Sequence, residues 1–193
     1  MKNKKSPPHG SKKYMTDQES INNMLNEPEV AYQTTSNTVF QAAFVNTKES
    51  FIKRTIQLMG LSQTSPFNKV KNISDFIYCI REGVPKKAVD NIIGITGMGS
   101  LEVASLLHTS DRNLRRYADE HRLNAEQSER IIEIAKVYSR GEDVFGTLDA
   151  FNDWMNSPLL AFAQAKPKEY LDTSMGIEML MEELGRIEHG IFA

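Results

Sequence analysis

The sequence predicts an all-α protein with a long polar segment ahead of its folded part. From about residue 72 onward, apolar residues recur every three or four positions, which is the spacing of one helix face. The alternating pattern of a β-strand does not compete with this spacing anywhere in that region. By contrast, residues 1 to about 38 are rich in Asn, Ser, Thr, Gln, Lys and Pro and show no sustained period.

The predicted organisation has three parts. Residues 1–71 are expected to form a polar, largely disordered extension that allows a short helix near residues 48–60, followed by a linker over residues 62–71. Residues 72–122 are predicted to form a helix-turn-helix domain, and residues 123–193 a small helical C-terminal domain. With 193 residues, of which 40% are hydrophobic, the chain can bury one good core or two small ones.

The first helices of the folded part are placed by their start and stop signals. Gly83 is expected to end a helix that begins after Asn72, and Pro85 to start the next helix in its first turn. Ser100 is expected to cap the helix after that. Three glycines are expected to break the chain before this cap: Gly94, Gly97 and Gly99.

The stretch over residues 101–117 predicts two short helices joined by a tight turn, the pattern of a DNA-binding helix-turn-helix. Ala104 is a small residue at the point where two crossing helices must approach closely. His108 occupies the turn position where glycine is usual, and histidine accepts a positive φ better than most residues. Four apolar residues are expected to share a small core: Val103, Leu107, Leu114 and Tyr117.

The second helix of this pair carries the candidate DNA-binding residues. Arginine guanidinium groups pair with guanine or phosphate and an asparagine amide pairs with adenine, while a serine can both cap the helix and meet a phosphate. The candidates are Ser110, Arg112, Asn113, Arg115 and Arg116. The alternative is that these arginines form surface ion pairs with Glu102, Asp119 or Glu120, which would contribute little energy.

A long helix is predicted to follow this pair. Asn124 and Gln127 have the spacing of a capping box at its start. Apolar residues continue at helical spacing towards Phe145, and Gly146 is the expected stop. Residues 147–155 then predict a short helix with its apolar residues, Trp154 among them, on one side that faces the core.

The last helix of the chain is predicted from its cap and its apolar stripe. Asp172 or Thr173 is the expected N-cap. The stripe is Ile177, Leu180, Met181, Leu184 and Ile187. Gly190 is the expected stop.

Composition and motif spacing argue against catalysis and export. The formal net charge is −2, so DNA binding must depend on a local basic surface. The four histidines show no metal spacing and Cys79 has no evident histidine partner, so we expect no metal, no cofactor and no enzymatic activity. Cys79 lies in an apolar run, where a buried thiol typical of a reducing cytoplasm is expected. No apolar run approaches the roughly 18 residues of a membrane span, so no membrane partner is expected.

Five segments occur in an order and spacing that resemble one known family. They are Ile-Arg-Glu-Gly-Val-Pro at 80–85, the helix pair at 101–117, Ala-Glu-Gln-Ser-Glu-Arg at 125–130, Val-Phe-Gly at 144–146 and Leu-Gly-Arg-Ile-Glu-His-Gly-Ile-Phe-Ala at 184–193. Together they resemble the Xre/MbcA/ParS antitoxin family over roughly the last 120 residues. The resemblance implies a cytoplasmic homodimer that neutralises a cognate RES-domain toxin, an enzyme that consumes NAD or ADP-ribosylates a target. It also implies that the antitoxin binds operator DNA and represses its own operon.

The same resemblance implies that the C-terminal end lies at the active-site cleft of the toxin. The residues concerned are Arg186, Glu188, His189, Ile191, Phe192 and Ala193. An apolar end makes a compact plug for a concave site. Alternatively, Ile191 and Phe192 fold back onto the core of their own domain. A second function also stays open, namely a stand-alone helix-turn-helix transcriptional regulator whose C-terminal helices serve only dimerisation.

Overall fold

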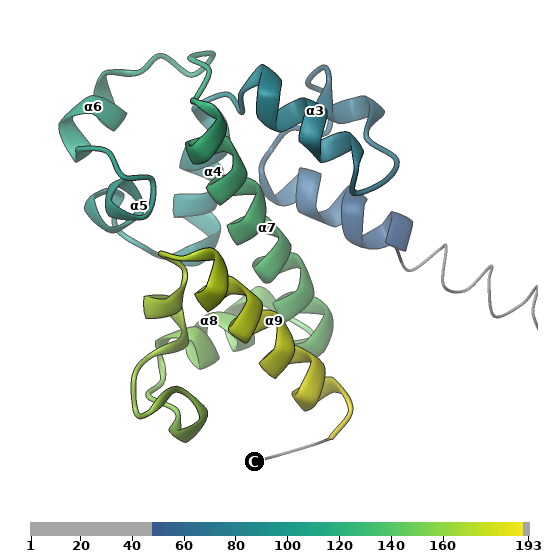
Figure 1. Cartoon of the computed structure of the whole chain (residues 1–193), viewed down its shortest axis with the longest axis vertical. Helices are drawn as coiled ribbons and strands as arrows, with labels where there is room; N and C mark the ends of the chain where they lie inside the picture. The colour runs from purple at the N-terminus through teal and green to yellow at the C-terminus, as the bar shows by residue number, and fades with distance from the viewer. Residues whose placement is uncertain (1–47, 191–193) are drawn as a thin grey trace, which may run out of the picture. The chain divides into compact units, whose positions relative to one another are not determined.

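The computed structural model describes residues 48–190 of the chain (Figure 1). Within these residues the backbone forms helices and short 3₁₀ turns and no β-strand, which confirms the predicted all-α class. The polar extension before residue 48 and the terminal residues Ile191, Phe192 and Ala193 lie outside the described residues, together with the predictions made for them.

The described part begins with a helix over residues 48–58. The elements that follow, with η for a 3₁₀ turn, are η1 (Phe67–Lys69), α3 (Asp75–Glu82), α4 (Lys87–Thr96), α5 (Ser100–Leu106), α6 (Asp111–Arg116), α7 (Ala125–Phe145), α8 (Leu148–Asn156), η2 (Leu160–Phe162), η3 (Pro167–Tyr170) and α9 (Ser174–Glu188).

The long helix α7 is the centre of the described region, with α5 and α6 on one side of it in this view and α8 and α9 beside its lower half (Figure 1). It packs against α3, α4, α8 and α9, and its buried side chains include Ile131 and Tyr138. The predicted capping box is present: the Asn124 side chain accepts a hydrogen bond from the Gln127 N–H at 2.9 Å. Gly146 ends the helix with φ of +81°, as a left-handed C-cap requires.

The hydrophobic core begins before residue 72, where the sequence analysis places the start of the folded body. Ile52, Ile56 and Met59 have helical spacing and are at most 5% exposed. Phe67, in η1, is also fully buried. The stretch over residues 62–71 is therefore packed structure and not a linker. Its polar composition conceals this, because one buried aromatic side chain is enough to hold a short turn against the core.

The structure also corrects the predicted start of α4 and one of the predicted chain breaks before α5. Pro85 does not lie in the first turn of α4, which begins at Lys87. Pro85 instead pairs in an antiparallel bridge with Arg122, so its backbone is held in place by the segment before α7. Gly94 lies inside α4, whereas Gly97 ends that helix with φ of +65°.

One core spans the boundary that the sequence analysis draws between residues 122 and 123. Buried residues from the 48–58 helix through α9 form a single hydrophobic cluster. Since α7 packs both against α3 and α4 and against α8 and α9, it belongs structurally to both predicted parts. The two candidate surfaces described below therefore share a common support.

Candidate functional site

The helices α5 and α6 form the predicted pair around a tight turn (Figure 1). Ala104 is buried, and its carbonyl accepts a hydrogen bond from the Thr109 N–H at 3.0 Å, which closes the turn. His108 adopts φ of +49°, the left-handed conformation expected of the turn position. Of the four apolar residues predicted to share the core of this pair, the first three are buried and the last is half-buried: Val103, Leu107, Leu114 and Tyr117.

Side-chain hydrogen bonds fix the start of α6. Ser110 caps the helix as predicted, since its hydroxyl accepts from the Asn113 N–H at 3.1 Å. Ser100 is the first residue of α5 and not its N-cap, which is Gly99. The Ser100 hydroxyl donates to Asp111 Oδ1 at 2.5 Å. Arg115 Nε lies 2.8 Å from Asp111 Oδ2. The Ser100 hydrogen bond, followed by the contact with Arg115, holds the pKa of Asp111 below its usual range.

The candidate DNA-binding residues all belong to α6 or its cap and are exposed to solvent. Arg115 is paired with Asp111 on its own helix. In the part of the chain that the structure describes, no ion pair involves Arg112 or Arg116, and Glu102 pairs with Lys168 at 3.0 Å instead. Two guanidinium groups on this face are therefore available for phosphates or base edges.

The second candidate set lies at the end of α9. Arg186 Nη2 is 2.7 Å from Glu183 Oε2, one turn earlier on the same helix. Glu188 forms an ion pair with Arg140 of α7, and His189 is exposed at the C-cap. Two of the three described candidates therefore already have partners within the chain. The remaining candidates lie outside the described residues: Ile191, Phe192 and Ala193.

Next to this set is a groove that the sequence analysis does not predict. It has a volume of about 430 Å³ and is bounded by α8, α9, the end of α7 and the loop between α8 and η3. We call it the α8–α9 groove, and its lining residues are Phe145, Trp154, Leu159, Leu160, Ala161, Glu183 and Ile187. These residues come from four separate segments, so no periodicity along the chain indicates that they lie together. Leu160 is 79% exposed, and helical periodicity does not indicate this because Leu160 lies between the two predicted helices that flank it.

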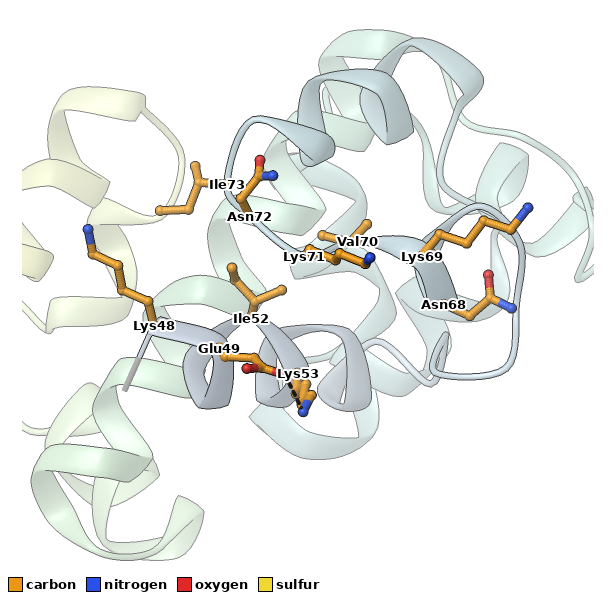
Figure 2. A pocket seen from close by; sticks show the side chains of 10 residues that line it. All are labelled: Lys48, Glu49, Ile52, Lys53, Asn68, Lys69, Val70, Lys71, Asn72 and Ile73. Carbon is orange, nitrogen blue, oxygen red and sulfur yellow. Dashed lines mark ion pairs between the residues drawn. The ribbon is translucent and has the colours of Figure 1, made fainter. Parts of the chain in front are cut away.

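A second groove, of about 590 Å³, lies between the 48–58 helix and the segment over residues 68–73 (Figure 2). Figure 2 shows an apolar floor that includes Ile52 and Val70 with lysine side chains around it, one of which, Lys53, pairs with Glu49 at 2.6 Å. None of its lining residues belongs to either candidate set.

Cys79 is buried, and the described residues offer neither a metal site nor a helix able to span a membrane. Cys79 is 1% exposed, and burial raises the pKa of its thiol to about 11. Among residues 48–190, no three His, Cys, Asp or Glu side chains are grouped so that they could hold a metal ion. The helices that the structure describes include none with the length and apolar character needed to span a bilayer.

Two family models match this chain. The antitoxin Xre-like helix-turn-helix domain matches residues 75–136. The antitoxin Xre/MbcA/ParS C-terminal toxin-binding domain matches residues 140–190. The first match contains α5 and α6, and the second contains the whole α8–α9 groove and the described candidates at the end of α9.

Three curated proteins are similar to the chain over more than half of its length. Antitoxin Xre of Photorhabdus laumondii is 31% identical over 114 residues, which cover 58% of this chain and 77% of that protein. Antitoxin Xre of Yersinia enterocolitica is 28% identical over 116 residues, covering 59% and 78%. The Prs ADP-ribosylating antitoxin of a Sphingobium species is 26% identical over 129 residues, covering 62% and 81%.

Proposed function

Because this chain belongs to the Xre/MbcA/ParS family of antitoxins, we propose that it binds and neutralises a RES-domain toxin and represses its own operon. The observation that carries the first part is the match of residues 140–190 to the toxin-binding domain of the family. The similarity to a Prs ADP-ribosylating antitoxin supports a toxin that draws ADP-ribose from NAD. In this function the chain acts by binding and not by catalysis.

In the proposed neutralisation, the end of α9 covers the active site of the toxin. Thr173 caps α9 by accepting from the Gly176 N–H at 3.1 Å, and the ion pair between Glu188 and Arg140 holds the other end of the helix against α7. A helix fixed at both ends loses little conformational entropy when it binds a partner. The proposed contacts are Arg186, Glu188, His189, Ile191, Phe192 and Ala193.

In the proposed repression, α6 enters the major groove of operator DNA. Support comes from the exposed arginines of this helix, two of which have no ion pair among the described residues, and from the well-defined cap at Ser110. The proposed contacts are Ser110, Arg112, Asn113, Arg115 and Arg116. Since α6 has only 6 residues, one copy reaches few base pairs, so we propose that a homodimer reads two half-sites.

Neutralisation is tested by co-expressing the chain with the protein encoded beside it. The expected result is that the neighbouring protein alone arrests growth and lowers cellular NAD, while co-expression restores both and the two proteins purify together. A neighbour that is harmless and does not bind would contradict the proposal. It would leave the alternative of a stand-alone transcriptional regulator.

The role of the C-terminal end is tested by deleting residues 191–193. We expect loss of growth rescue while operator binding and thermal stability stay unchanged. If the shortened chain neutralises the toxin as well as the full chain does, the covering of the active site by this end is disproved.

A further inference from the structure

The α8–α9 groove has rigid aromatic walls. The Trp154 ring stacks on Phe151 with centroids 5.6 Å apart and lies 5.5 Å from the ring of Phe145. Phe162 also meets Trp154, edge to face, with ring centroids 6.0 Å apart. Because Phe151 and Phe162 are buried, this cluster fixes the half-exposed Trp154 in place. The groove is therefore preformed and needs little ordering when a ligand binds.

One edge of the groove is a tight loop that displays Leu160. The loop is closed by hydrogen bonds from the Leu159 N–H to the Ala165 carbonyl at 3.2 Å and from the Gln164 N–H to the Leu159 carbonyl at 2.9 Å. Ala163 and Gln164 both have a positive φ, of +52° and +67°, which is unfavourable for residues with a Cβ. This strained loop leaves Leu160 79% exposed beside the groove. Because Leu160 adjoins the apolar walls of the groove, it belongs to a contiguous apolar patch, which is typical of an interaction surface.

The helices that bound the groove are acidic. Together α8 and α9 carry six acidic side chains and one basic one, namely Asp149, Asp153, Glu178, Glu182, Glu183, Glu188 and Arg186. Glu183 itself lines the groove. The α6 helix has the opposite balance, with three arginines and one aspartate. Glu183 is paired with Arg186 and Glu188 with Arg140, yet α8 and α9 together keep an excess of acidic over basic side chains. This excess disfavours DNA phosphates near the groove and favours a cationic protein surface.

We propose that the α8–α9 groove is a docking site on which the toxin seats an apolar side chain flanked by lysine or arginine. This proposal rests on the proposed function, because the toxin-binding family model covers the entire groove. The groove supplies affinity through buried apolar contact, while the end of α9 covers the active site. Removing the groove contact therefore weakens the complex without removing the residues that block the toxin.

Two other occupants fit the groove less well. A second copy of the chain that placed the same two helices against these would bring like charges together, since α8 and α9 have an excess of acidic side chains in both copies. The terminal segment Ile191, Phe192 and Ala193 has apolar side chains but no basic one to complement the acidic excess of α8 and α9. A basic and apolar segment of the toxin satisfies both requirements.

The affinity test uses the full chain, the co-expressed neighbouring toxin and the variant Leu160→Asp. Leu160 is so exposed that the change leaves the fold intact, whereas a charge at the groove edge excludes an apolar side chain. We expect the affinity of Leu160→Asp for the toxin to be about 30-fold lower or more, as for a hot-spot residue. The affinity of the unchanged full chain for the toxin should fall with added salt. The matched control is Met175→Asp, since Met175 is 75% exposed on α9 and does not line the groove.

The outcomes of the affinity test separate the two proposals. A wild-type chain that does not bind the toxin contradicts the proposed function, and the docking proposal fails with it. A wild-type chain that binds while Leu160→Asp binds equally well overturns the docking site alone. Equal losses in Leu160→Asp and Met175→Asp also overturn it, because the effect would not be specific to the groove.

The occupant of the groove is identified with a probe at Trp154, the single tryptophan of the chain. This chain alone is labelled with 5-fluorotryptophan, and its ¹⁹F resonance is followed. We expect the resonance to shift when the toxin is added and not on dilution or on deletion of residues 191–193. A shift on dilution would assign the groove to a second copy, and a shift on deletion would assign it to the chain's own end, and either result overturns the proposal.

Discussion

Arg54 donates two hydrogen bonds to Glu142, from Nε to Oε2 at 2.5 Å and from Nη2 to Oε1 at 2.6 Å. This bidentate pair connects the 48–58 helix to the last turn of α7, across 88 positions of sequence. Both side chains are partly buried, so solvent screens the pair less than it screens a surface ion pair. The 48–58 helix is therefore held by charge as well as by its apolar face.

Replacing Arg54 by Met removes this pair and is expected to lower the free energy of unfolding by about 1 kcal/mol. For a protein of this size, that corresponds to a fall in melting temperature of about 2–4 °C. The measurement is thermal unfolding followed by circular dichroism. Lys53→Met is the control, because Lys53 pairs with Glu49 on the exposed side of the same helix and should change stability by less than about 0.5 kcal/mol. Equal effects of the two substitutions would refute the structural role of the Arg54 pair.

Replacement by alanine is expected to have opposite effects on stability at two glycines that lie inside helices. A Cβ at Gly141 would lie 2.4–2.5 Å from ring atoms of Phe151, whereas a Cβ at Gly185 has no atom within 4 Å. Gly141→Ala should therefore destabilise the protein by about 1–3 kcal/mol through overpacking. Gly185→Ala should stabilise it by about 0.5–1 kcal/mol, because alanine restricts the unfolded backbone. Urea unfolding of both variants checks this, and a stable Gly141→Ala variant would mean that α7 and α8 pack less closely than described.

Local signals in the sequence predict much of the fold. The capping box of Asn124 and Gln127, the cap at Ser110 and the left-handed turn at His108 each depend on neighbouring residues only, and all three are present. Pro85 also has the local signal of a helix start, but its bridge to Arg122 overrides that signal. At Pro85 the error in helix placement arises because a contact distant in sequence sets the backbone.

The α8–α9 groove illustrates what sequence patterns cannot give. Helical spacing predicts Trp154 in the core, and the structure finds it half-buried as one wall of a groove. Glu183 is charged and lies outside the apolar stripe of α9, yet the neighbouring loop makes it part of the same wall. A groove depends on which segments leave space between them, and this is decided by packing that neither helical periodicity nor capping residues encode.

The turn between α5 and α6 contains stored strain that can be relieved. His108 has φ of +49°, and in the described residues only Ala163 and Gln164 share a positive φ without being glycine. His108→Gly should raise the free energy of unfolding by roughly 0.5 kcal/mol. Glycine removes the strain energy of the left-handed conformation, and this gain exceeds the free-energy cost of the more flexible unfolded chain. Urea unfolding measures this. Thr109→Gly is the control, because its φ is not positive and the same change there should destabilise. If His108→Gly is the less stable of the two, the turn conformation is wrong.

The last prediction concerns the basic face of α6. Replacing both Arg112 and Arg116 by Ala should lower operator affinity at least tenfold, since these guanidinium groups have no ion pair within the described part of the chain. If both arginines bind phosphates, the slope of log affinity against log salt should also become shallower in the variant. The expected change is about one unit for each phosphate contact that the variant loses. The measurement is fluorescence anisotropy with operator DNA at several salt concentrations.

Two controls give this DNA-binding prediction its specificity. Arg81→Ala removes an exposed arginine of α3, outside the helix pair, and should leave the affinity and the salt slope unchanged. Growth rescue in the presence of the toxin should be unaffected by the α6 double variant, because the toxin-binding family model begins only at residue 140. Unchanged operator binding by the double variant would mean that α6 is not the recognition helix. If the double variant lost both growth rescue and DNA binding, the two activities would share a surface. That result would contradict the separation suggested by the opposite charges of α6 and of the α8–α9 pair.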